Sequence, residues 1–477
     1  MSVDMSHETP SVCGSCGSAP GMTHLSWCEA APDGERVSAE GCFARVMKGG
    51  ASDKVPREML VVDTGQPQVP PPEMRHPKTA EDVDELYRWT IRNGIVDHHG
   101  IDAVVLDIPT EATRRCAAKM VADFPEEVVA LIKERDIRHV TGHVDSDLDS
   151  ITATYFTKRL VETRDAASLP NFVKSLGDAV NRTDYGRVQE ADPEKLVHML
   201  PGVFMSLKSV SLRPMGSEMG AIWRNGDIPA ADKPARAAQV SEKYHKLLIE
   251  RMFAFYNACV RADRDGKKID FDAIDFDALD LSPGLRATLN EGVLNTMEAF
   301  EAFNIEFAAA ERHPMRVTTK NGDQIDVTLL LFPQTKLTPL MVTNMSYTRV
   351  PPETIVAAYI GPNDKKIDCY DIGIRPETLD LFDIAFLEVP LNQAEADKRA
   401  PLLAELKEKE TAGTLDPLEA ERLKIWTTLR QGKEYLGHGD PTVAVAGGSL
   451  VAASNTSLLT PEDFRAVILA EVGKRQA

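Results

Sequence analysis

The apolar positions of residues 51–190 alternate between short continuous runs and helical spacing. Short runs, which predict buried strands, lie at 60–62, 95–96 and 137–140, and helical spacing is found at 79–93, 125–135 and 151–160. Strands that alternate with helices in this way favour a mostly parallel sheet covered by helices on both faces. In the helix at 79–93 we expect Leu86, Trp89 and Thr90 to face the core, and the proline-rich stretch at 66–77 is expected to be a loop.

Beyond residue 190 the pattern changes twice. Helical spacing dominates up to residue 310, as at 240–260 and 282–310, with Trp223, Phe253, Phe255 and Tyr256 expected in the core. Strand-like runs return at 324–332, 354–360 and 442–446, and a charged helical hairpin at 391–431 interrupts them. We therefore expect an α/β chain in four parts: a Cys-rich segment (1–50), a mostly parallel α/β domain (51–190), a helical connector or lid (191–312) and a smaller C-terminal α/β domain (313–477).

The charge balance limits the partners. The chain carries 54 basic and 73 acidic side chains, a formal charge of −19, which argues against duplex nucleic acid as a partner. No apolar run approaches the roughly 20 residues of a membrane helix, and no secretory leader is indicated. We expect a cytoplasmic protein without a membrane partner, either a monomer or a homo-oligomer.

The seven cysteines fall into two groups. Cys116, Cys259 and Cys369 lie in globular segments, where we expect them to pack as small apolar side chains. The others lie in a stretch with little else to build a core, and they could close a structural zinc site: Cys13, Cys16, Cys28 and Cys42. His24 could replace one of these ligands, and a flexible tail that carries thiols is the alternative.

Acidic and imidazole side chains stand where each predicted strand of the 51–190 domain ends. Asp63 follows the first run, Asp97, His98 and His99 follow the second, and the loop after the third holds His143, Asp147 and Asp149. The carboxyl ends of parallel strands share one sheet edge, where open α/β sheets bind their ligands. Imidazole nitrogen combined with carboxylate oxygen suits Mn²⁺ and, with fewer nitrogens, Mg²⁺. A helix N-cap is the alternative for a single Asp of this loop, but three Asp residues and a His exceed what a cap needs.

These residues resemble the motifs of the DHH phosphoesterase superfamily, which includes RecJ-like exonucleases, nano-RNA and cyclic-dinucleotide phosphodiesterases, exopolyphosphatases and family II pyrophosphatases. The loop with His143, Asp147 and Asp149 is similar to the first motif, Asp63 to the second, and Asp97-His98-His99 to the third. Asp184 is the candidate for the fourth, with Asp178 close by. In the family the His-x-x-x-Asp-x-Asp motif comes first, so its later position here indicates a circular permutation or, alternatively, one chance match.

The resemblance implies two divalent ions, Mn²⁺ or Mg²⁺, and a water that they activate. His143, Asp147 and Asp63 would hold one ion, and Asp149, Asp63, His98 and Asp184 would hold the other. His99 would contact or protonate the phosphate. Asp97 would orient a neighbouring imidazole, unless it only closes the turn.

A glycine-rich stretch near the C-terminus is loosely similar to the Gly-Gly-Gly-His turn of the second domain in many DHH phosphoesterases. If the similarity holds, backbone N–H groups and an imidazole would grip the substrate at Gly437, His438, Gly447 and Gly448.

Together these features predict a metal-dependent hydrolase that cleaves a phosphodiester or short-chain phosphate, with a small nucleotide or oligonucleotide favoured as substrate. Pyrophosphatase or exopolyphosphatase activity is the alternative, but only isolated cations such as Arg349, Arg375 and Lys433 are available to hold a second phosphate. In another class, the chain could be a non-catalytic nucleotide-binding or regulatory protein with a zinc module. The chemically competent ligand set favours the enzyme.

Overall fold

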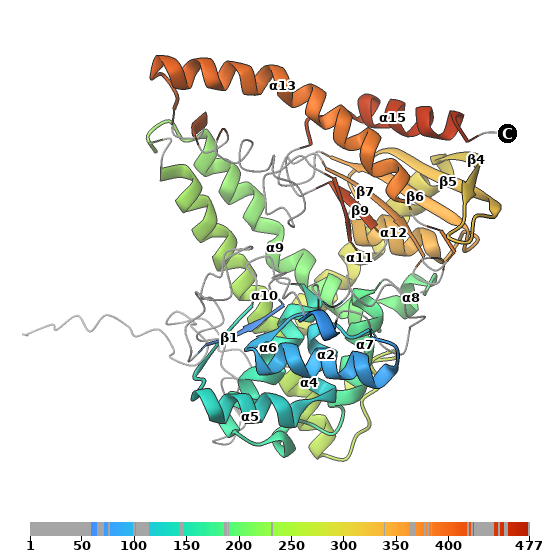
Figure 1. Cartoon of the computed structure of the whole chain (residues 1–477). Coiled ribbons are helices and arrows are strands. Elements are labelled where there is room, and N and C mark those ends of the chain that lie inside the picture. The colour runs from blue at the N-terminus through green and yellow to red at the C-terminus, as the bar shows by residue number, and fades with distance from the viewer. Residues whose placement is uncertain are drawn as a thin grey trace, which may run out of the picture.

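The computed structural model of the chain describes residues 59–63, 71–74, 77–98, 101, 114–142, 147–185, 188, 190–229, 232–337, 339–361, 369–375, 378, 381–382, 384–416, 419–420, 423, 443–446, 449–452 and 457–475. Within them, helices accompany a small parallel sheet and a larger mixed sheet, which confirms the predicted mixture of helix and strand (Figure 1). None of the helices in these residues is long and apolar enough to cross a membrane.

The first sheet is parallel and has the strand order β2-β1-β3. Its strands are β1 (Met59–Val62), β2 (Ile95–Val96) and β3 (His139–Thr141), and the helices around it are α2 (Ala80–Arg92), α4 (Ala117–Asp123), α5 (Pro125–Arg135), α6 (Leu148–Thr163) and α7 (Val173–Asp184). The central strand pairs on both sides, with Val61 opposite Ile95 and Leu60 opposite Val140. Because the strands run in the same direction, their carboxyl ends open at one edge of the sheet.

Local sequence signals explain these helices. The first, α2, begins at a capping box in which Thr79 and Asp82 satisfy each other's backbone N–H groups. Pro125 occupies the first turn of α5, where a missing N–H costs nothing. The prediction for the inward face of α2 is wrong at Trp89, which is half-buried, because helical spacing places Val83 and Tyr87 on the core side with Leu86 and Thr90.

Long helices follow and share the core of the first sheet. They are α9 (Leu200–Arg224), α10 (Lys233–Arg264) and α11 (Pro283–Ala309), with the short α8 (Pro193–Leu196) before them. One continuous hydrophobic core extends from Leu60 to Leu289 and includes the fully buried Phe253, Phe255 and Tyr256. The side chain of Trp223 lies outside the described residues.

Two hydrogen bonds fasten α6 to α10. The Tyr155 hydroxyl donates to Oδ1 of Asn257 over 2.7 Å, and the Thr152 and Tyr256 hydroxyls lie 2.6 Å apart. Both pairs are buried, so the hydroxyls of Tyr155, Thr152 and Tyr256 are satisfied within the core. The helix that follows β3 is therefore held by a helix about a hundred residues further along the chain.

The second sheet has six strands in the order β4-β5-β6-β7-β9-β8. Its strands are β4 (Glu311–Thr318), β5 (Gln324–Thr335), β6 (Thr354–Ile360), β7 (Cys369–Ile374), β8 (Val443–Ala446) and β9 (Ser449–Ala452). Only β5 and β6 pair in parallel, and every residue of β6 is buried. One face packs on α13 (Glu388–Ala412) and α15 (Pro461–Gly473), and the other on α11 and α12 (Pro339–Tyr347). Figure 1 shows α13 and α15 lying over this sheet, away from the β1–β3 unit.

Some predicted features of this region are observed and others are not described. The strands expected at 324–332, 354–360 and 442–446 correspond to β5, β6 and β8, whereas β4, β7 and β9 were not predicted. The first arm of the charged helical hairpin is α13, and most of the second arm lies outside the described residues. The same holds for the side chain of Cys369, whereas Cys116 and Cys259 are buried, as expected.

Candidate metal centre

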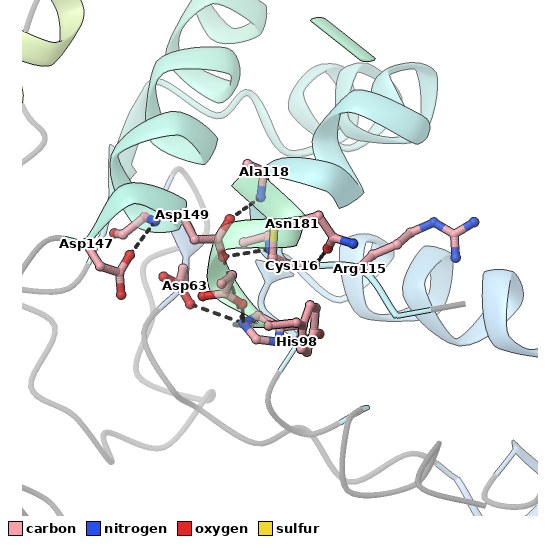
Figure 2. A network of polar contacts seen from close by, with 12 residues as sticks. Asp63, His98, Arg115, Cys116, Ala118, Asp147, Asp149 and Asn181 are labelled. Atoms are coloured by element: carbon pink, nitrogen blue, oxygen red, sulfur yellow. Dashed lines mark hydrogen bonds and ion pairs between the residues drawn. The ribbon is translucent and has the colours of Figure 1, made fainter. Parts of the chain in front are cut away.

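The carboxyl edge of the parallel sheet carries a buried group of acids around one histidine. Asp63 directly follows β1, His98 lies two residues after β2, and Asp149 lies in the first turn of α6. One ligand atom from each of these three side chains lies within 4.8 Å of the others, and all three residues are buried. Figure 2 shows Asp63, His98 and Asp149 converging on one space.

The imidazole of His98 is the centre of this group. Its Nε2 lies 3.9 Å from Oδ1 of Asp63, 3.8 Å from Oδ2 of Asp149 and 3.5 Å from Oδ2 of Asp184, the last residue of α7. Its Nδ1 lies 3.0 Å from the hydroxyl of Tyr185. One ring nitrogen therefore faces the carboxylates while the other contacts a phenol.

The N-terminus of α4 fixes the carboxylate of Asp149. Its Oδ2 accepts the N–H of Ala117 over 2.8 Å, and its Oδ1 accepts the N–H of Ala118 over 2.7 Å. Burial raises the pKa of Asp149, while the nearby His98 and the N–H of Ala118 act to lower it. Since each carboxylate oxygen has two lone pairs, the two N–H bonds hold the group in place and leave room for a cation.

The Cys116 thiol lies at the start of α4. Burial, together with the negative charge of Asp149, raises its pKa well above the usual value of 9.0. The donor atoms that face one another around Nε2 of His98 are carboxylate oxygens.

Asp63 has an unusual backbone conformation. Its φ is 46°, in the left-handed region, and its N–H donates to the carbonyl of Val96 over 2.8 Å. Asp tolerates this region better than most residues, yet the conformation still stores strain. The turn bends the chain at the end of β1 and presents the carboxylate to His98.

The loop after β3 is anchored by a helix cap. Oδ1 of Asp147 accepts the N–H of Ser150 over 2.9 Å at the start of α6, so the capping role considered for a single Asp of this loop applies here. Gly142, just before the loop, packs so closely on α6 that an added Cβ would lie 2.7 Å from the Ser150 hydroxyl and 3.2 Å from that of Thr154. A larger residue would displace the start of the helix that carries Asp149.

The structure separates the two candidates for a fourth acid. Asp184 reaches His98, whereas Asp178 is half exposed and pairs with Lys119 over 2.8 Å. Asp97 is buried beside the centre. Other predicted residues lie outside the described part of the chain: the metal ligand His143, the catalytic candidate His99, the substrate-binding candidates Gly437, His438, Gly447 and Gly448, and the zinc candidates Cys13, Cys16, Cys28 and Cys42.

Two residues of the candidate site, Asn181 and Tyr185, were not predicted from the sequence. Asn181 joins α7 to the segment before α4, because its Oδ1 accepts the N–H of Cys116 over 2.7 Å and its Nδ2 donates to the carbonyl of Arg114 over 3.0 Å. Tyr185 contacts His98. Its position directly after Asp184 was the only sequence signal, while nothing in the sequence marks Asn181.

The chemistry of the group fits a bound cation. Among the described residues no Lys or Arg pairs with the buried Asp149, although burying an uncompensated carboxylate is costly. Carboxylate oxygens with one imidazole nitrogen suit several divalent metals, so the donor set alone does not select one. The buried Asp63-His98-Asp149 group could hold a metal ion.

Comparison with protein-family models, with curated proteins and with solved structures finds no match for this chain.

Proposed function

We propose that this protein is a divalent-metal-dependent phosphohydrolase that cleaves a phosphodiester or short-chain phosphate in a small nucleotide or oligonucleotide. The observation that carries the proposal is the buried group of Asp63, His98 and Asp149 at the carboxyl edge of a parallel sheet. Asp184, 3.5 Å from the same imidazole nitrogen, adds a further carboxylate. Mn²⁺ or Mg²⁺ is the metal proposed.

Each side chain has a defined task in this proposal. When bound, divalent ions of this kind supply an activated water and stabilise the charge that develops at phosphorus. Asp63, Asp149 and Asp184 would provide oxygen ligands, and His98 would provide Nε2 while Tyr185 holds its other nitrogen. The Ala117 and Ala118 N–H groups prevent Asp149 from rotating away when substrate enters.

The described ligands account for one ion. A second ion would draw on Asp63 and Asp147, together with His143, which lies outside the described residues. Asp147 uses one carboxylate oxygen as a helix cap, and its other oxygen would serve as the ligand.

The proposed kinship is with the DHH phosphoesterase superfamily in a circularly permuted form. The position of the acids supports it, since Asp63, His98 and Asp149 meet at one sheet edge although their motifs follow an unusual order in the chain. A metal site depends on where strand ends lie in space and not on the order in which they are connected.

The test is a hydrolysis assay with the full chain. Metal-free protein would be supplied with Mn²⁺, Mg²⁺, Zn²⁺ or Ca²⁺ and offered bis-p-nitrophenyl phosphate, a short oligonucleotide or pyrophosphate. We expect Mn²⁺-dependent cleavage of the esters, which Asp149→Ala abolishes and the exposed control Asp178→Ala retains. Equal activity in Asp149→Ala, or no turnover with any metal, would overturn the proposal. Faster release of phosphate from pyrophosphate would favour the pyrophosphatase alternative.

A further inference from the structure

Arg114 occupies a defined place beside the candidate metal centre. It stands at the start of the short segment that leads into α4, and its carbonyl accepts a hydrogen bond from Asn181 of α7. The same asparagine binds the N–H of Cys116 two residues later. The backbone at Arg114 is therefore fixed to the helix that ends at Asp184.

The Nε of Arg114 is buried and has no polar partner among the described residues. Arg114 is 7% exposed, and its Nε is shielded from solvent and makes no hydrogen bond. In the described part of the chain the group has neither a hydrogen bond nor an ion pair. The Cζ of Arg114 lies over the ring of Tyr185, 5.9 Å from the ring centroid. Burying a cation in this state is costly unless something else satisfies it.

Its neighbour Arg115 is in the opposite situation. The Arg115 guanidinium pairs with Asp84 and with Asp123, each over 2.8 Å, and Figure 2 shows it directed away from the acidic group. Successive side chains of an extended segment point to opposite sides. Arg115 therefore serves the packing of α2 against α4, and Arg114 is left on the side of the metal centre.

Arg114 is connected to the candidate metal centre through Tyr185. Its guanidinium lies over the Tyr185 ring, the Tyr185 hydroxyl lies 3.0 Å from Nδ1 of His98, and Nε2 of His98 faces the carboxylates. Because this guanidinium pairs with no acid among the described residues, it is available for an anion from outside the protein. A guanidinium can donate two parallel N–H groups to a phosphate.

We propose that Arg114 is a substrate-binding residue that holds the two non-bridging oxygens of the substrate's phosphodiester beside the metal centre. The inference rests on the proposed phosphohydrolase function and assigns to it the residue that recognises the phosphate. The guanidinium would donate hydrogen bonds to the phosphate oxygens, and these bonds would contribute affinity for phosphate. Because the guanidinium is planar, two parallel bonds would also fix the orientation of the phosphorus. No covalent step involves Arg114.

The test compares Arg114→Lys and Arg114→Gln with the matched control Arg115→Lys. For bis-p-nitrophenyl phosphate with Mn²⁺, we expect kcat/KM to fall roughly 10- to 100-fold in both Arg114 variants and to stay within about twofold in the control. The inhibition constant of inorganic phosphate should rise in parallel. The affinity for Mn²⁺, measured by titration calorimetry, should stay unchanged, which shows that the variants are folded and that the metal ligands are intact.

Chemical rescue separates recognition from packing. Guanidinium added at low millimolar concentration should restore part of the activity of Arg114→Ala, which a purely structural role would not allow. An active wild type with unchanged kcat/KM and phosphate inhibition in the Arg114 variants would refute the assignment and leave the phosphohydrolase proposal standing. A wild type that cleaves nothing with any metal would refute both.

Discussion

The hydroxyl of Tyr185 lies 3.0 Å from Nδ1 of His98, and the two rings meet edge to face with their centroids 5.7 Å apart. The contact concerns which ring nitrogen of His98 carries the proton. With Nδ1 protonated and donating to the phenol oxygen, Nε2 carries the free lone pair that faces Asp63, Asp149 and Asp184. In this tautomer the imidazole can bind a metal through Nε2.

Tyr185→Phe removes this hydroxyl and keeps the ring. We expect the affinity for Mn²⁺ to fall about 10- to 100-fold, the usual effect of losing a hydrogen-bond partner of a histidine ligand. Titration calorimetry on metal-free protein measures it. Tyr244→Phe is the control, because its hydroxyl binds Glu218 over 2.7 Å far from the centre. Equal Mn²⁺ affinity in the wild type and in Tyr185→Phe would show that the phenol does not orient the imidazole.

Gly142→Ala tests the close packing between β3 and α6. The new Cβ would lie 2.7 Å from the Ser150 hydroxyl, and we expect a loss of about 1–3 kcal/mol in the free energy of unfolding. Urea unfolding gives the value. In a Ser150→Ala background most of this loss should disappear, because the overlapping oxygen is gone. The same loss in both backgrounds would place the strain elsewhere.

Asn181→Ala removes both hydrogen bonds between α7 and the segment before α4. The N–H of Cys116 and the carbonyl of Arg114 would be left without these partners in a buried place. We expect a cost of about 2–4 kcal/mol in unfolding free energy. Asn171→Ala, which loses only an exposed bond to Asp263, should cost less than about 1 kcal/mol. Similar losses in the two variants would contradict this account.

The raised pKa of Asp371 leads us to expect that the stability of the second sheet depends on pH. It is buried on β7, accepts the Thr343 hydroxyl over 2.6 Å, and burial raises its pKa from the usual 3.8 to about 6. The folded state therefore keeps a proton that the unfolded state releases, and the stabilisation present below about pH 4 is lost as the pH rises towards 6. A rise of this size corresponds to about 3 kcal/mol.

Asp371→Asn cannot titrate and can still accept the Thr343 hydroxyl. Relative to the variant, the wild type should lose stability between about pH 4 and pH 6 and change little above it. Denaturant unfolding across this range gives the difference. Parallel pH profiles for the two proteins would mean that Asp371 titrates normally.

Sequence periodicity predicted the elements whose signals are local. The bounds expected for α5 and β6 match those observed, and α2 begins and ends next to its predicted limits, because capping residues, proline and apolar spacing act within a few residues. The strand β4 was not predicted because it contains Pro314, a residue that an edge strand tolerates. Strand pairing over long distances leaves no such local signal.

In the candidate centre, too, the residues with a local sequence signal were predicted and the others were not. Asp63, His98 and Asp149 were marked by their position after apolar runs, and the structure brings them together. Arg114 and Arg115 are adjacent and chemically identical, so the sequence does not distinguish the paired guanidinium from the unpaired one. Their difference arises only in the folded chain, where Asp84 of α2 and Asp123 of α4 pair with Arg115.

The hydrogen bonds from α10 to α6 have a consequence for the order of events during synthesis. The described acids of the centre lie between Asp63 and Asp184, but Tyr256 and Asn257, which fasten α6, are made much later. Because a chain folds as it leaves the ribosome from the N-terminus onward, α6 has to wait for α10 before its position is fixed. We therefore expect the nascent chain to become able to bind a metal at the candidate centre late, after the helical region has emerged.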